Sequence, residues 1–201
     1  MNTRKLILPL VSGIFVLMAA GFGSAAYAGP PTISTVPVND LVNGGVIAGA
    51  SSKIIRTDKG ITVSVNTTVS PGAYTMWLLI WNNPENCHGN TGVPGLRCVP
   101  GPPPDFDPPS CVLFGTGHVV GNNGTLNYTA HRKVYDATDN IGGACPNGLT
   151  NPRGADVHAA VRTHGEKIPG MVDQQIHTVG GGCGTNECLE VQASPHEEPL
   201  P

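Results

Sequence analysis

The sequence predicts an all-β fold, a single-domain antiparallel β-sandwich with long loops pinned by disulfides. Several short stretches alternate apolar and polar residues, as strands with one buried face do. The 201-residue chain also contains 27 glycines and 19 prolines, which favour short strands and turns because both residues disfavour helix interiors. Its six cysteines would supply the disulfides.

Residues 1–28 are expected to form a signal peptide. Arg4 and Lys5 precede an apolar stretch, and an Ala-Tyr-Ala sequence before Gly29 has the small-x-small pattern that signal peptidase cleaves. The mature chain would carry nine basic and 14 acidic residues, a net charge of −5. This balance argues against nucleic acid as a partner, and no membrane span is expected after cleavage. The expected location is therefore periplasmic or secreted.

The mature chain is expected to divide into three parts. Residues 29–43 form a polar, proline-containing lead-in that could add an edge strand, residues 44–193 form the β-sandwich domain, and residues 194–201 form an acidic tail. Within the domain, two short strand candidates lie in 44–57. Residues 61–68 then alternate β-branched and polar side chains, which predicts a half-buried strand.

The stretch from Ala73 to Trp81 is the longest apolar run of the mature chain and contains both tryptophans. It does not alternate, so both faces of the expected strand need cover. The Thr75, Trp77, Leu79 and Trp81 face is expected to be covered by the irregular, proline-rich insertion 82–110, because so long a loop in a compact domain is usually functional or folded back.

Residues 111–120 and 125–131 are predicted to be strands of one hairpin, joined by the Gly-Asn-Asn-Gly turn at 121–124. Residues 157–164 form another strand, with His158, Arg162 and His164 on the face opposite its apolar residues. Residues 171–179 suit either a helix or a strand, and 189–193 form the last strand. Seven to nine short strands at this spacing predict an immunoglobulin-like general architecture.

The cysteine spacing favours the disulfides Cys87–Cys98, Cys111–Cys145 and Cys183–Cys188, since neighbours in sequence pair most easily. Fifteen pairings exist for six cysteines. An alternative role for Cys183 and Cys188, which are separated by four residues, is a metal clip.

Four segments together resemble a group of exported bacterial proteins that have no assigned activity. They are Trp-Asn-Asn-Pro-Glu-Asn-Cys at 81–87, Asn-Pro-Arg-Gly-Ala-Asp-Val-His at 151–158, Arg-Thr-His-Gly at 162–165, and Cys-Leu-Glu-Val-Gln at 188–192. The resemblance covers the mature chain and implies export, but no mechanism.

No catalytic residue is predicted, because the chain has none of the familiar nucleophile, zinc-protease or phosphate-binding motifs. The leading hypothesis is a non-enzymatic module that binds an envelope or extracellular partner. Its expected contact residues are His158, Arg162, His164, Trp77 and Trp81, since Arg162 and His164 are spaced to hold an anionic group.

Two alternative functions remain open. No cofactor is expected for the leading hypothesis, and a metal ion is expected only for the first alternative. The first is a copper or zinc protein that uses histidines of adjacent strands, chosen from His118, His131, His158 and His177. His158 and His164 lie six residues apart on one strand face, roughly 20 Å, and so cannot share one ion. The second alternative is a hydrolase without a familiar motif.

Overall fold

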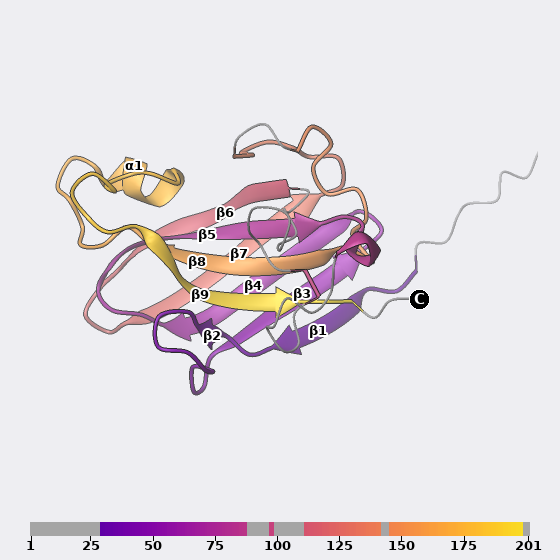
Figure 1. Ribbon diagram of the computed structural model, residues 1–201, viewed down its shortest axis with the longest axis horizontal. Coiled ribbons are helices and arrows are strands. Elements are labelled where there is room, and N and C mark those ends of the chain that lie inside the picture. Colours follow the sequence, from indigo (N-terminus) through magenta and orange to yellow (C-terminus); the bar gives the residue numbers. More distant parts are fainter. Residues whose placement is uncertain (1–28, 88–96, 99–110, 142–144, 199–201) are drawn as a thin grey trace, which may run out of the picture.

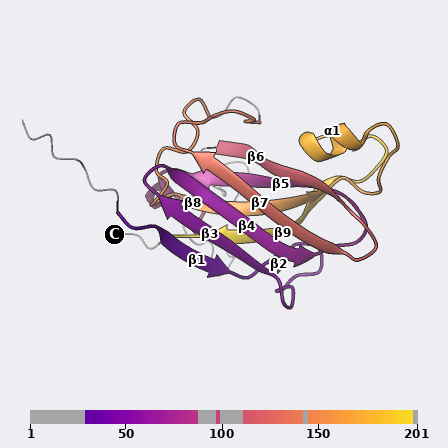
Figure 2. The same ribbon diagram turned by 180° about the vertical axis from the view of Figure 1, so that it is seen from behind.

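The computed structural model describes residues 29–87, 97–98, 111–141 and 145–198. They form two antiparallel sheets stacked face to face, which confirms the predicted fold (Figures 1 and 2). The expected signal peptide, residues 1–28, lies outside the described residues. In the part of the chain that is described, no helix is long and apolar enough to cross a membrane.

The first sheet has the strand order β1-β3-β4-β7. These strands are β1 (Thr32–Val36), β3 (Ser51–Thr57), β4 (Gly60–Thr68) and β7 (Thr125–Lys133). The lead-in thus contributes the edge strand β1, and the alternation read in 61–68 is confirmed, with Ile61, Val63 and Val65 buried.

The second sheet has the order β2-β9-β8-β5-β6. Its strands are β2 (Asn39–Asp40), β9 (Leu189–His196), β8 (Asp156–Thr163), β5 (Gly72–Trp81) and β6 (Cys111–Val120). The apolar strand β5 lies between β8 and β6. The strand β9 extends to His196, so three residues that the sequence assigned to the tail belong to the sheet.

The expected hairpin of β6 and β7 is wrong. The turn at 121–124 forms, with Gly124 N donating to Gly121 O at 3.1 Å, but β6 pairs with β5 while β7 pairs with β4 in the other sheet. Alternation shows which face of a strand is buried and carries no information about its neighbour, so this connection crosses between the layers.

One hydrophobic core fills the space between the sheets. On β5, the inward residues Met76, Leu78 and Ile80 are fully buried, and they meet the inward residues of β4, β7 and β8. The opposite face of β5 is covered as well, since Trp77 and Trp81 are only 5% and 3% exposed.

The cover of this second face comes partly from an unexpected segment. The helix α1 (Val172–His177), in the stretch that the sequence left unassigned, packs against β5 and β6. The ring of Trp77 meets that of Phe114 at 5.2 Å, and Phe114 in turn meets His177 at the end of α1. Of the insertion expected here, residues 82–87 and 97–98 are described, and Cys98 is fully buried beside Asp156 at the start of β8.

All three predicted disulfides are present: Cys87–Cys98, Cys111–Cys145 and Cys183–Cys188. The first two lie near the end of the sandwich where β5 finishes. The third closes a six-residue loop between α1 and β9.

Candidate functional site

The predicted contact residue Arg162 serves as a clamp within the protein. From β8, its Nε donates to Val179 O at 2.9 Å, its Nη2 donates to Cys188 O at 3.1 Å, and its Nη1 pairs with Glu190 at 2.6 Å. The guanidinium therefore holds the segment that follows α1 against the sheet, and 17% of its side chain is exposed.

His164 is fully buried and bonded at both ring nitrogens. Its Nε2 lies 2.9 Å from Thr75 Oγ1 and its Nδ1 lies 2.7 Å from Gly181 O. Trp77 Nε1 also donates to Thr75 Oγ1, at 2.8 Å, so the threonine hydroxyl is free to donate to His164. The proton of the neutral ring then sits on Nδ1, where it bonds to Gly181 O. Burial holds the pKa of His164 below its ordinary value.

His158 lies farther along the same face, in contact with Trp81; the ring centroids are 4.6 Å apart and the ring planes are tilted by 53°. It is 4% exposed, its Nε2 has no hydrogen-bond partner, and burial lowers its pKa to about 4. The structure thus places the five predicted contact residues on one face of the second sheet, but as a covered layer, in which Arg162 alone keeps appreciable exposure.

The four histidines of the metal alternative are spread over the fold. His118 on β6 meets the ring of Tyr128, His131 on β7 bonds to Thr62 on the first sheet, and His177 ends α1 beside Asp173. Among the described residues, the one group of three side chains with ligand atoms close enough for an ion is His164, Cys183 and Cys188. In this structure Cys183 and Cys188 are joined in a disulfide, so their sulfurs are not free to bind an ion.

A second polar cluster, which the sequence did not predict, fills one end of the sandwich, where the β9 arrow ends in Figure 1. Arg56 on β3 is fully buried; its guanidinium donates to the carbonyls of Pro152, Ala155 and His196 and pairs with Glu198 at 2.6 Å. Every carbonyl it reaches comes from a segment about 100 residues or more away.

Asp156 completes this cluster. It is fully buried, binds the Arg97 guanidinium through both oxygens, and accepts from Glu198 N at 3.1 Å. The ionised side chains here are thus paired and bonded, as burial of charge requires. We call Ser52, Arg56, Asp156, His196 and Glu198 the closed end.

The closed end contains a serine and histidine pair that bears on the hydrolase alternative. Ser52 Oγ lies 2.7 Å from His196 Nε2, the spacing of a nucleophile and its base. Both side chains are fully buried, however, and burial together with the charge of Arg56 lowers the pKa of His196 to about 3. A substrate has no access to this pair, and so weak a base is poorly matched to neutral pH.

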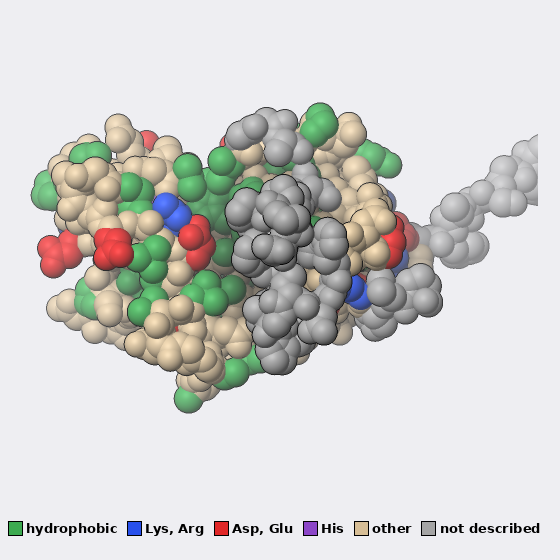
Figure 3. All heavy atoms as spheres, in the orientation of Figure 1, with side chains coloured by type: hydrophobic (Ala, Val, Ile, Leu, Met, Phe, Trp, Pro, Cys, Tyr) green, Lys and Arg blue, Asp and Glu red, His purple; other side chains and the backbone are tan. Residues whose placement is uncertain are grey.

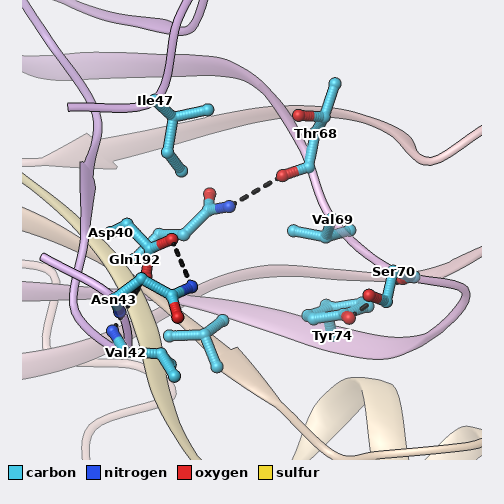
Figure 4. Close-up of a pocket in the computed structure, with 10 residues that line it drawn as sticks. Asp40, Val42, Asn43, Ile47, Thr68, Val69, Ser70, Tyr74 and Gln192 are labelled. Carbon is cyan, nitrogen blue, oxygen red and sulfur yellow. Dashed lines mark hydrogen bonds between the residues drawn. The ribbon is translucent and has the colours of Figure 1, made fainter. Parts of the chain in front are cut away.

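At the other end of the sandwich, the layers part around a pocket of about 500 Å³ (Figure 4). The turn after β2, the end of β4, the start of β5 and the middle of β9 surround it. Its lining consists of Asp40, Val42, Asn43, Ile47, Thr68, Val69, Ser70, Tyr74, Val191 and Gln192. This volume lies within the usual range for small-molecule sites. We call Asp40, Thr68, Ser70, Tyr74 and Gln192 the pocket end.

The polar groups of the pocket offer mainly hydrogen-bond acceptors. Gln192 is 5% exposed; its Nε2 donates to Thr68 O at 2.8 Å, which leaves its Oε1 buried without a partner. Tyr74 donates its hydroxyl to Ser70 O at 2.9 Å, and burial raises its pKa, so the phenol stays protonated. Bonds from the side chain and backbone of Asn43 and from Val42 N lower the pKa of Asp40, which stays ionised.

The inward position of Gln192 depends on a bulge. Val161 pairs with Gln192, whereas Arg162 pairs with Glu190, so Val191 is an extra residue in β9. Glu190 therefore faces outward with Arg162, and Gln192 faces inward with buried Val161. No feature of the sequence marks this bulge.

Comparison of the chain with models of protein families, with curated proteins and with solved structures finds no match.

Proposed function

We propose that this protein is an exported, non-enzymatic β-sandwich module that binds a small, partly apolar ligand in the pocket end. The observation that carries the proposal is the pocket of about 500 Å³ itself, with the buried, unpartnered Oε1 of Gln192 at its wall. A buried acceptor without a partner costs free energy, and a ligand that donates a hydrogen bond would recover it.

The walls and the polar groups define the ligand class. Ile47, Val69, Val191 and the Tyr74 ring provide apolar contact, while the acceptor without a partner is Gln192 Oε1. The nearby Asp40 carboxylate disfavours an anion. The fitting ligand is neutral or cationic, has an apolar body, and carries at least one N–H or O–H donor.

The rim of the pocket supports a binding role. The turn after β2 exposes three large apolar side chains, Leu41 (51%), Val42 (61%) and Val46 (62%), and Val42 also lines the pocket. Figure 3 shows hydrophobic side chains at the protruding lower edge of the molecule, over this turn. Apolar groups gathered beside a pocket indicate a surface that is covered when a ligand or its carrier docks.

The lining of the pocket argues for binding rather than catalysis. Its titratable side chains are Asp40 and Tyr74. The carboxylate of Asp40 accepts three hydrogen bonds from the turn that it stabilises, and the phenol of Tyr74 is held protonated. Neither group has the shifted pKa near neutrality that a general base or acid needs.

The test uses N-phenyl-1-naphthylamine, a neutral fluorescent probe with one N–H donor and a size that suits the pocket. The wild-type protein should enhance its fluorescence in a saturable way, with about one site per chain. Ile47→Trp would fill the pocket with a larger side chain and should weaken probe binding at least tenfold.

The matched control is Ile33→Trp, which adds the same ring to a 64% exposed position on β1, outside the pocket. This variant should bind the probe as the wild type does. Gln192→Met, which removes the acceptor and keeps the side-chain length, should weaken binding severalfold. Equal binding by the wild type and Ile47→Trp, or no binding by either, would overturn the proposal.

A further inference from the structure

We propose that His164, Cys183 and Cys188 form a redox-gated metal site that takes Zn²⁺ or another thiophilic cation once the Cys183–Cys188 disulfide is reduced. The ligand atoms of the three side chains lie within 4.8 Å of one another, and His164 Nδ1 is 3.8 Å from Cys188 Sγ. In tetrahedral zinc sites, nitrogen and sulfur ligands are about 3.5 Å apart, given bond lengths near 2.0 and 2.3 Å. Small movements would therefore assemble three ligands.

Of the three disulfides, Cys183–Cys188 is the most accessible to a reductant. Cys183 and Cys188 are both partly exposed. In the other two disulfides, Cys98 is fully buried, and Cys111 and Cys145 are each 1% exposed. A dithiol can therefore attack Cys183–Cys188 in the folded protein, whereas the other bridges are shielded on at least one side.

The loop leaves more space after Cys183 than before it. A Cβ at Gly184, after the first cysteine, would meet no atom within 4 Å, whereas one at Gly181 would lie 2.1 Å from Gln174 O, and Cys183 N donates to Gly180 O at 3.1 Å. The backbone before Cys183 is therefore held against α1, and rotation of the Cys183 side chain supplies the adjustment while β8 and β9 stay paired. The guanidinium of Arg162, bonded to Cys188 O, places a positive charge close to the second sulfur, where it favours the thiolate.

The bonds of His164 suit a metal ligand. Its ring is neutral, which is the form that coordinates a cation. For Nδ1 to bind a metal, the ring proton moves to Nε2, which then donates to Thr75 Oγ1 at the present distance of 2.9 Å. Thr75 Oγ1 has two lone pairs, so it can accept from Trp77 and His164 together. Thr75 would thus orient the ring as an outer partner of the metal site.

The chemistry requires a dithiol as the reductant. The dithiol transfers two electrons and two protons to the Cys183–Cys188 bond, so the sulfur–sulfur bond breaks, two thiols form, and the reductant becomes a cyclic disulfide. A divalent cation then binds the two sulfurs and His164 Nδ1 and releases both thiol protons. The fourth position of a tetrahedral ion stays open to water or a ligand.

The test compares oxidised and reduced full-length protein with Co²⁺ as the spectroscopic probe. After treatment with dithiothreitol and its anaerobic removal, the wild type should bind one Co²⁺ per chain, with thiolate-to-cobalt charge-transfer absorption that Zn²⁺ displaces. The oxidised protein should show neither. His164→Gln should weaken Co²⁺ binding at least tenfold after reduction.

Two controls separate this site from the other cysteines and from misfolding. The double variant Cys183→Ser/Cys188→Ser keeps the other two disulfides and should give no charge-transfer band after the same treatment. His177→Gln changes a half-exposed histidine outside the site and should bind Co²⁺ as the wild type does. Circular dichroism checks that each variant is folded. A charge-transfer band that persists in the double serine variant, or that His164→Gln leaves unchanged, would overturn the proposal, whatever the pocket binds.

Discussion

The two ends of the sandwich differ in the charge of their buried polar side chains and in the space beside them. Both draw on the inner row of β9, which contributes His196 at the closed end and Gln192 at the pocket end. At the closed end, the charges of Arg56 and Asp156 are paired, while His196 keeps one bond, to Ser52, and its Nδ1 has no hydrogen-bond partner. At the pocket end, Gln192 keeps one bond, its second polar atom has no partner, and a cavity remains.

Each end thus keeps one neutral side chain with an unpartnered atom, and the ends differ in that a pocket lies beside Gln192 while ion pairs surround His196. Ionised groups buried at the closed end need their partners, because a lone charge in that environment is very costly. A neutral amide such as that of Gln192 costs less free energy than a lone charge when one of its polar atoms has no hydrogen-bond partner. The substitutions below test the contrast, beginning with the largest expected effect.

Arg56→Met should have the largest effect on stability. It leaves three buried carbonyls and the Glu198 carboxylate without their donor, which is expected to cost about 3–5 kcal/mol of unfolding free energy. Urea unfolding at neutral pH measures the loss. Arg153→Met is the control, since Arg153 makes comparable bonds to Asp58 and Gly29 at the surface and should lose less than about 1 kcal/mol. Similar losses in both variants would contradict the contrast.

His158→Phe should reduce the acid sensitivity of the fold. The pKa of His158 is about 4 in the folded protein and about 6.5 when unfolded, so the unfolded chain binds an extra proton between these values. Its contribution to stability is complete above pH 6.5 and is lost as pH falls towards 4, by roughly 3 kcal/mol in all.

Phenylalanine binds no proton, so the variant does not lose stability in this way at low pH, and it also removes an Nε2 that has no hydrogen-bond partner. The unfolding free energy of His158→Phe should lie within about 1 kcal/mol of the wild-type value at pH 7.5 and should be the larger of the two at pH 5. Unfolding free energies from pH 7.5 to 4.5 provide the measurement, with His177→Gln as an exposed control. Parallel pH curves for the wild type and His158→Phe would show that burial of His158 does not set this dependence.

Two deletions of a single hydroxyl give the smallest effects and the most direct comparison. Ser52→Ala removes the partner of His196 in a sealed space and should cost about 1–3 kcal/mol. Tyr74→Phe removes the bond to Ser70 O, which water can reach through the pocket, and should cost about 1 kcal/mol or less. Thermal unfolding of both variants tests the order, and the reverse order would mean that the pocket end is the more tightly packed of the two.

Much of the fold could be predicted because it depends on local patterns. Alternation identified β4, β7 and β8, and cysteine proximity identified all three disulfides. The double-sided burial of β5 also followed from its composition. The partner of each strand did not, which is why β6 and β7 were expected to pair with each other.

The candidate sites were harder to predict because they depend on distant partners. Arg56 follows Ile54 on the inward face of β3, but its carbonyl partners are 96 or more positions away, and no local signal names them. Gln192 faces inward through a bulge that exists only in the pairing of β8 with β9. The sequence predicted His164 as a contact residue because it lies on the polar face of its strand. The side chains nearest to it that could bind a metal, Cys183 and Cys188, come from the loop after α1.

The position of β9 in the second sheet determines which part of the fold can form last. β9, the last of the described strands, lies between β2 and β8 and brings His196 to Arg56. Closing such long loops costs chain entropy before the contacts form, so sheets of this topology fold slowly. The second sheet cannot be completed until β9 is available to pair with β8, so the closed end, which needs His196, forms only after the strands that precede β9.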